Sequence, residues 1–145
     1  MIPDLGQPYS PTWQGGPPHM GIGDVPLWRR YQAKHALEWI AVYYDSALGE
    51  PAPAPEGQTP AQIDMWQRIT RLRADAVILT RDGWIIAEVR PHAGPAALGA
   101  LYTYLITFEA DPPTRDPVTA LLITDRVTHD LRLAADKLGI AIEIV

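Results

Sequence analysis

The sequence has no cysteine, no long hydrophobic run and no excess of positive charge. The lack of cysteine excludes disulfides and thiolate metal sites, which fits a reducing compartment. Apolar residues make up 47% of the 145 residues, but no uninterrupted apolar run approaches the ~20 residues that span a bilayer. The N-terminus also lacks a basic start followed by an apolar core, so we expect no signal peptide. These absences indicate a soluble protein with one core.

The charge balance argues against a protein that only binds nucleic acid. Twelve basic and seventeen acidic side chains give a formal charge of −5. An acidic protein lacks the broad attraction that dominates affinity for DNA or RNA. Arg68, Arg71, Arg73 and Arg81 lie close in sequence and could still form a local basic patch. The alternative is that they are scattered, solvated charges.

Residues 1–26 are predicted to form an extended, irregular arm. The segment contains six prolines and five glycines, with Tyr9 and Trp13 as its only aromatic residues. Proline lacks a backbone donor, and glycine loses the most entropy in a regular element. Such an arm is ordered only if it lies on a surface, either of its own domain or of a neighbouring subunit. We therefore divide the chain into this arm and an α/β domain over residues 27–145.

The domain is predicted to alternate helices and strands. A stripe at helical spacing predicts a helix from Trp28 to about Leu48: Trp28, Tyr31, His35, Trp39 and Val42. Later helices are predicted at residues 59–70, where Thr59 and Gln62 can form a capping box, at residues 96–109, and between Asp125 or Thr124 and Gly139. Strands are predicted at 118–124 and 140–145. With the hairpin described next, this order predicts a mixed sheet with helices on both faces.

The segment from Arg73 to Arg90 reads as a β-hairpin that gathers charged groups. Two apolar runs flank Arg81-Asp82-Gly83, a strong turn signal. Side chains alternate along a strand, so Glu88 and Arg90 share one face. Folding the ribbon about its turn returns Asp75 to the neighbourhood of both. Two carboxylates and a cation at the open end of a hairpin indicate a site. Individually, the same residues could form a structural ion pair.

These residues resemble the PD-(D/E)xK nuclease superfamily. Asp75 takes the place of the family's aspartate, and Glu88-Val89-Arg90 takes the place of Glu-x-Lys. The segment GALYTY, residues 99–104, is similar to a frequent Gly-Gln-Leu-x-x-Tyr, with Ala100 in the glutamine position. Glu38 could correspond to a carboxylate that many members carry on their first helix. The resemblance covers residues 28–145 and implies a restriction-endonuclease-like mixed α/β fold.

The resemblance also implies metal-dependent phosphodiester cleavage, but two residues of this sequence differ from the family's motif. In an active member, Asp75 and Glu88 would bind Mg²⁺, which activates water to attack a phosphodiester. Arg90 stays protonated and cannot act as a base, although it could hold a phosphate or pair with Glu88 or Asp75. Ala100 removes a further polar group. Asp75, Glu88, Arg90 and Glu38 are therefore candidate or vestigial catalytic residues.

Two functions from different classes follow. The first is a non-catalytic structural protein without a cofactor, which keeps a degenerate nuclease fold and contacts other subunits through its N-terminal arm. By analogy, we expect a component of a phage virion, in the neck or tail connector. The alternative is an active Mg²⁺-dependent endonuclease that cleaves DNA. The expected location is the virion or the cytoplasm, without membrane contact.

Overall fold

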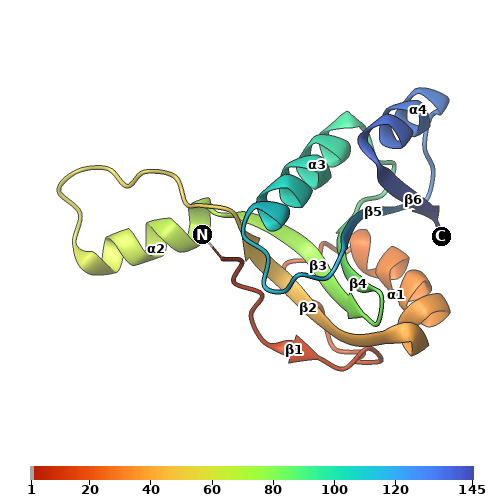
Figure 1. Cartoon of the computed structure of the whole chain (residues 1–145), viewed down its shortest axis with the longest axis horizontal. Helices are drawn as coiled ribbons and strands as arrows, with labels where there is room; N and C mark the ends of the chain where they lie inside the picture. The colour runs from red at the N-terminus through yellow and green to blue at the C-terminus, as the bar shows by residue number, and fades with distance from the viewer. Residues whose placement is uncertain (1) are drawn as a thin grey trace.

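The computed structural model describes residues 2–145 and contains one six-stranded mixed sheet (Figure 1). Its strands, in spatial and sequence order, are β1 (Pro8–Tyr9), β2 (Trp39–Leu48), β3 (Leu72–Thr80), β4 (Gly83–Val89), β5 (Val118–Thr124) and β6 (Ile140–Ile144). The helices are α1 (Asp24–His35), the 3₁₀ turn η1 (Ala36–Glu38), α2 (Pro60–Thr70), α3 (Pro95–Ala110) and α4 (His129–Leu138). Strands β1 to β4 pair antiparallel, whereas β4, β5 and β6 pair in parallel.

Hydrophobic side chains cover both faces of the sheet, as the strand patterns require. Val77, Ile86 and Leu122 pack with α3 and α4 on one face. Their sequence neighbours Ile78, Ala87 and Ile123 pack with α1 on the other face. Successive side chains of a strand point to opposite faces, so nearly continuous apolar strands need helices on both sides. The predicted mixed α/β architecture is confirmed.

The hairpin and the later elements match the sequence predictions closely. The turn connects β3 to β4 at Arg81-Asp82, and Gly83 has φ of 129°. A side chain on Gly83 would collide with the carbonyl oxygen of Pro117. Helix α2 begins with the predicted capping box between Thr59 and Gln62. Helix α4 ends at Gly139 as expected, but Thr128 caps its start, so the predicted cap at Thr124 or Asp125 is wrong.

The helix predicted over residues 28–48 is wrong in its second half. Helix α1 ends at His35, and residues 39–48 form β2, which pairs along β3. The helical stripe is misleading because two elements contribute to one cluster: Trp28 lies on α1, Trp39 on β2, and their rings stack at 5.6 Å. The segment WIAVYY is rich in β-branched and aromatic residues, which favours a strand.

The N-terminal arm lies on its own domain. Strand β1 extends the sheet beside β2, and Asp4 forms a further antiparallel bridge with Ala47. Tyr9 and Trp13 pack against Tyr44, with ring centroids 5.3 and 5.6 Å away. Of the two surfaces that the sequence left open, the arm therefore occupies its own domain. Over residues 2–145, no helix is both long and apolar enough to cross a membrane.

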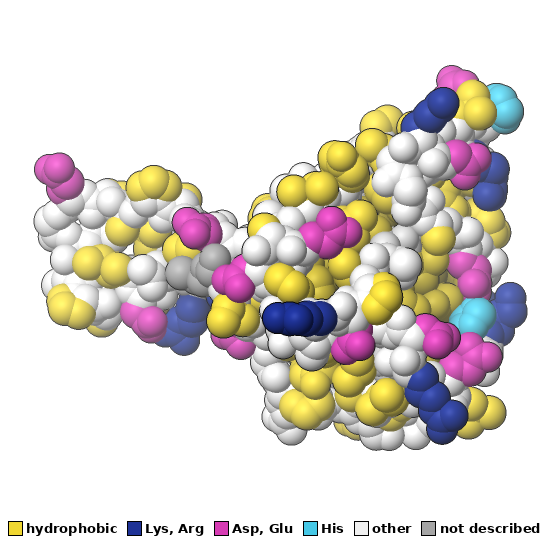
Figure 2. All heavy atoms as spheres, viewed as in Figure 1, with side chains coloured by type: hydrophobic (Ala, Val, Ile, Leu, Met, Phe, Trp, Pro, Cys, Tyr) yellow, Lys and Arg dark blue, Asp and Glu magenta, His cyan; other side chains and the backbone are white. Residues whose placement is uncertain are grey.

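Helix α2 projects from this body with the loop that precedes it (Figure 1). None of its eleven described residues is buried. The space-filling view shows hydrophobic side chains on this projecting lobe (Figure 2). It is bonded to its own loop: the indole N–H of Trp66 donates to the carbonyl oxygens of Ala52 and Pro53.

Candidate functional site

The open end of the β3–β4 hairpin carries a pair of carboxylates. The ladder between these strands includes Ala76 opposite Ala87, so Asp75 and Glu88 lie opposite each other one residue further along. Directly opposed residues place their Cβ atoms about 4.5–5.5 Å apart on the same face of a sheet. The structure thus brings Asp75 and Glu88 together, and the reason is the register that the Arg81-Asp82 turn imposes.

Arg90 and the backbone hold the two carboxylates in place. The Asp75 Oδ2 atom accepts a hydrogen bond of 2.8 Å from the amide N–H of Val89. The guanidinium of Arg90 donates to Glu88 Oε1 at 2.6 Å, and 53% of the Arg90 side chain is exposed. The structure therefore places Asp75, Glu88 and Arg90 together at the open end of the hairpin, as predicted.

Glu88 has an oxygen that lacks a partner. Its residue is 3% exposed, and its Oε2 atom is buried without a hydrogen-bond partner among residues 2–145. A buried carboxylate oxygen normally has a donor or a cation beside it, because leaving it unsatisfied costs free energy. Arg90 satisfies Oε1 alone. The unsatisfied oxygen indicates that a donor or a cation fits beside Glu88.

Burial and nearby negative charges make both carboxylates weak acids. Burial raises the pKa of Asp75 to about 6, although the Val89 N–H counteracts part of that rise. Burial and the nearby charge of Asp75 raise the pKa of Glu88 to about 7, against the opposing effect of Arg90. Two groups that resist ionisation together favour a state in which a shared proton or an added cation compensates their charge.

Two residues that the sequence analysis did not select also act on this site. The charge of Asp24, in the first turn of α1, contributes to raising the pKa of Asp75 and Glu88. Tyr104 of α3 is buried; desolvation and the charges of Glu88 and Asp75 raise its pKa to about 12. Asp24 could have been found from GIGDVP, a glycine-flanked acid before a proline, had the helix been predicted to begin there rather than at Trp28.

Glu38 does not join the acidic pair. It lies in η1, and the next residue, Trp39, pairs with Thr80 beside the hairpin turn. From Thr80 to Asp75 is five residues along β3, about 16 Å of strand. The expectation that Glu38 supplies a first-helix carboxylate to this site is therefore wrong, because the first helix ends at His35.

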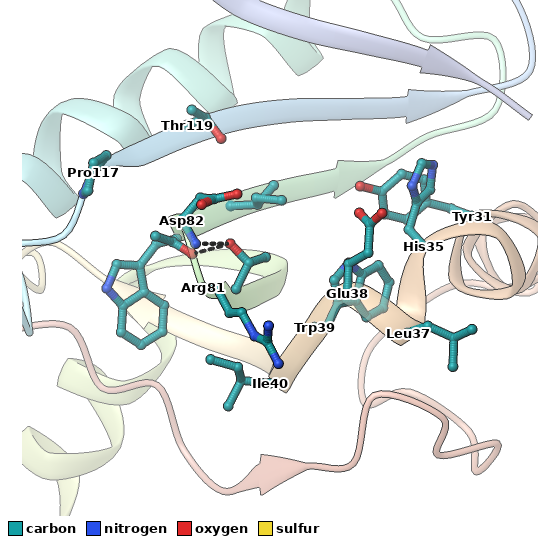
Figure 3. A pocket seen from close by; sticks show the side chains of 14 residues that line it. Tyr31, His35, Leu37, Glu38, Trp39, Ile40, Arg81, Asp82, Pro117 and Thr119 are labelled. Atoms are coloured by element: carbon teal, nitrogen blue, oxygen red, sulfur yellow. Dashed lines mark hydrogen bonds between the residues drawn. The ribbon is translucent and has the colours of Figure 1, made fainter.

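Glu38 instead lines a cavity of about 740 Å³ at the turn end of the hairpin. Figure 3 shows Glu38 beside Tyr31 and His35 at one end of this cavity, with Arg81 directed toward Ile40 at the other. His35 contacts Glu143 at 2.7 Å and packs against Tyr31, so it is a packed residue as its place in the stripe suggests. Asp75 and Glu88 are not among the lining residues of this cavity.

The acidic pair suits a hard divalent cation better than a softer metal. Carboxylate oxygens are the preferred ligands of Mg²⁺, which is often held by one or two carboxylates while water and phosphate oxygens complete its shell. Within residues 2–145, no group of three or more His, Cys, Asp or Glu side chains is arranged to hold a metal. A cation at this site would therefore have Asp75 and Glu88 as its two carboxylate ligands from the protein.

Comparison with known proteins identifies the fold. No protein-family model and no curated protein sequence matches the chain. The crystal structure of a repair endonuclease from Pyrococcus abyssi is similar, with a TM-score of 0.51 and 12% sequence identity. The match covers 90% of this chain and 49% of that one, so the chain spans about half the length of this endonuclease. At such low identity the likeness concerns the fold alone, which is restriction-endonuclease-like.

Proposed function

We propose that the chain is a divalent-metal-dependent nuclease that cleaves phosphodiester bonds of DNA at Asp75 and Glu88. The observation that carries the proposal is the buried Oε2 of Glu88, unpartnered within residues 2–145 and opposite a second carboxylate. A nuclease-like fold, shared with a repair endonuclease, supports the same reaction class. The N-terminal arm, packed on its own sheet, does not need a partner subunit to be ordered.

Each residue of the site has a proposed role. Asp75 and Glu88 hold the cation, and the Val89 N–H fixes the orientation of the Asp75 carboxylate. A bound Mg²⁺ would supply an activated water and neutralise charge on the phosphate. Arg90, half exposed and already bound to Glu88, positions that carboxylate and can contact a phosphate oxygen. Because its guanidinium stays protonated, Arg90 does not accept the proton of the attacking water.

Plasmid cleavage tests this proposal. Supercoiled DNA is incubated with the purified chain and Mg²⁺ or Mn²⁺ at about pH 8, where both carboxylates are ionised. We expect nicking or linearisation that falls roughly a hundredfold or more in Asp75→Asn and Glu88→Gln. Glu38→Gln is the matched control, because Glu38 lies at the other end of the hairpin, and it should cleave as the wild type does.

A second candidate function rests on the contact between Arg90 and Glu88. This fixed cation occupies one oxygen of the carboxylate that a metal would need. It also stands at the lysine position of the PD-(D/E)xK motif that these residues resemble. On that basis the chain would be a non-catalytic structural protein, such as a virion component of a phage neck or tail connector. Absence of cleavage with either metal, together with absence of metal binding, would favour this candidate over the nuclease.

A further inference from the structure

A second cluster of polar side chains lies beyond the carboxyl ends of β4 and β5. His92 lies in the turn that follows β4, and Asp125 and Arg126 directly follow β5. The two strands are parallel, so their carboxyl ends meet at one end of the sheet, the end that carries the acidic pair. The amide N–H of Arg90 donates to the carbonyl oxygen of Ile123 at 3.0 Å and extends the pairing there. Open α/β sheets commonly bind ligands outside the carboxyl ends of their strands.

Asp125 fixes both the backbone and the ring of His92. The main-chain N–H of His92 donates to Asp125 Oδ1 at 2.7 Å, and His92 Nδ1 lies 3.0 Å from Asp125 Oδ2. The same N–H holds the pKa of Asp125 below its ordinary value, so this carboxylate is ionised. His92 has φ of 48°, in the left-handed region that favours glycine. Other residues stay in that region only where their surroundings fix them, and such residues are concentrated at functional sites.

Arg126 is held by an imidazole rather than by a carboxylate. Its Nε and Nη2 atoms lie 2.7 and 3.1 Å from the Nδ1 and Nε2 atoms of His92. By contrast, Arg68, Arg73 and Arg90 each form an ion pair with an aspartate or a glutamate. Within residues 2–145, Arg126 is exposed and forms no ion pair. A guanidinium that is oriented but not paired with a carboxylate is suited to bind an anion, and its planar fork matches phosphate oxygens.

The chain keeps this cluster close to the acidic pair. His92 follows Glu88 by four residues, which span at most about 14 Å even when fully extended. One strand of a DNA duplex rises about 3.4 Å per nucleotide along the helix axis. A phosphate bound by Arg126 would therefore lie a few nucleotides from a phosphate that is cut at the acidic pair. Contacts of this kind set the register and orientation of DNA without reading its bases.

We propose that Arg126 binds a backbone phosphate of DNA a few nucleotides from the cleavage position, and that His92 and Asp125 position its guanidinium. Arg126 is the residue that contacts the phosphate, whereas His92 acts only through Arg126. The inference rests on the proposed function, because DNA as the ligand follows from it. A chain with a formal charge of −5 has no general attraction for DNA, so its affinity depends on such local cations.

The salt dependence of DNA binding tests the contact separately from cleavage. Fluorescence anisotropy of a labelled duplex is measured without divalent metal, in a parent variant that combines Asp75→Asn and Glu88→Gln and therefore lacks both proposed metal ligands. We expect Arg126→Gln to weaken binding about fivefold or more and to reduce the slope of log affinity against log salt by about 0.9, because one phosphate contact is lost. Arg115→Gln is the matched control: Arg115 is exposed before the other end of β5, and this variant should keep the slope of the parent.

A double-variant comparison tests the positioning role of His92. In the parent, His92→Ala should weaken binding, but it should add little when Arg126→Gln is already present, because both changes act on one contact. Arg126→Lys should retain the salt slope, since it keeps the positive charge. Circular dichroism checks that each variant is folded. Independent, additive effects of His92→Ala and Arg126→Gln overturn the positioning role.

Two results overturn the phosphate contact itself: a parent that does not bind the duplex, and equal affinities and slopes for Arg126→Gln and Arg115→Gln. Neither result depends on plasmid cleavage by the wild type. A reduced slope in Arg126→Gln supports the contact even if the wild type does not cleave, and in that case the nuclease proposal alone fails. Normal cleavage with an unchanged slope in Arg126→Gln contradicts this inference alone.

Discussion

At the scale of single residues, the position of Asp75 directly opposite Glu88 on neighbouring strands explains the electrostatics of the site. Two carboxylates that share a buried face repel each other, and only one of their oxygens is paired with Arg90. Ionising both groups in the folded protein therefore costs free energy, unless a cation is added. Such an arrangement is typical of functional sites. In a structural ion pair, by contrast, the charged oxygens of both partners have hydrogen-bond or ionic partners.

The free-energy cost of ionising the buried Asp75 predicts how the stability of the fold depends on pH. The folded-state pKa of Asp75, about 6, lies above its ordinary value of 3.8, so folding favours the protonated form. Its contribution to stability is complete below about pH 4 and is lost as pH rises through about 6. Without divalent metal, we expect Asp75→Asn to raise the free energy of unfolding by about 1–3 kcal/mol at pH 8 and to change little at pH 4.

Urea unfolding at the two pH values measures this difference. Glu38→Gln serves as the control, since it removes a carboxylate that lies outside the acidic pair and should show no comparable gain. A less stable Asp75→Asn variant at pH 8 would mean that the carboxylate is already compensated within the fold, and the argument for an added cation would fail.

The sequence predicts the acidic pair and Arg90 but misses Asp24, for a local reason. Strand alternation and a tight turn fix which side chains meet within a hairpin, so Asp75, Glu88 and Arg90 could be placed together from the sequence. Asp24 approaches them across the fold from another element, and its position depends on where α1 begins. No local pattern fixes such a long-range approach.

At the scale of elements, the N-terminal arm shows how a segment of loop composition becomes ordered. Proline and glycine content predicted an extended arm, and β1 is two residues long. The arm is held by aromatic packing and by side chains of α1: Gln32 donates to the carbonyl oxygens of Pro11 and Trp13 at 2.8 and 2.9 Å. Composition predicts the conformation, but the surface that the arm covers depends on the fold.

This packing predicts that the arm stabilises the isolated chain. Trp13→Ala removes an aromatic ring that lies against Tyr9 and Tyr44, and we expect a loss of about 1–3 kcal/mol in the free energy of unfolding. Thr12→Ala, at an exposed neighbouring position, should change stability by less than about 0.5 kcal/mol. Equal stability of Trp13→Ala and wild type in urea would indicate that the arm belongs on another subunit.

The boundary between α1 and β2 could not be read from periodicity alone. Aromatic and aliphatic residues at helical spacing continue from Trp28 to Val42, although the chain changes conformation at His35. The spacing persists because both elements supply rings to the cluster between α1 and the sheet. Short apolar segments are ambiguous in this way, and the β-branched and aromatic content of residues 39–44 was the better guide.

At the scale of the whole molecule, the order of elements was more informative than any single motif. A hairpin followed by strand–helix–strand alternation led to the mixed sheet, and the fold resembles that of a repair endonuclease. The projection of α2 was not predicted, because its amphipathic pattern would be the same whether it covered its own core or a partner. Local sequence specifies an apolar side but not the surface that it covers.

The central claim is that Asp75 and Glu88 together bind a divalent cation. Calorimetric titration of Mn²⁺ into the metal-free protein tests it most directly, at about pH 8, where both carboxylates are ionised and compete least with protons. We predict saturable binding that Glu38→Gln retains and that Asp75→Asn weakens by about tenfold or more. No binding to the wild type, or equal binding to Asp75→Asn, would contradict the claim.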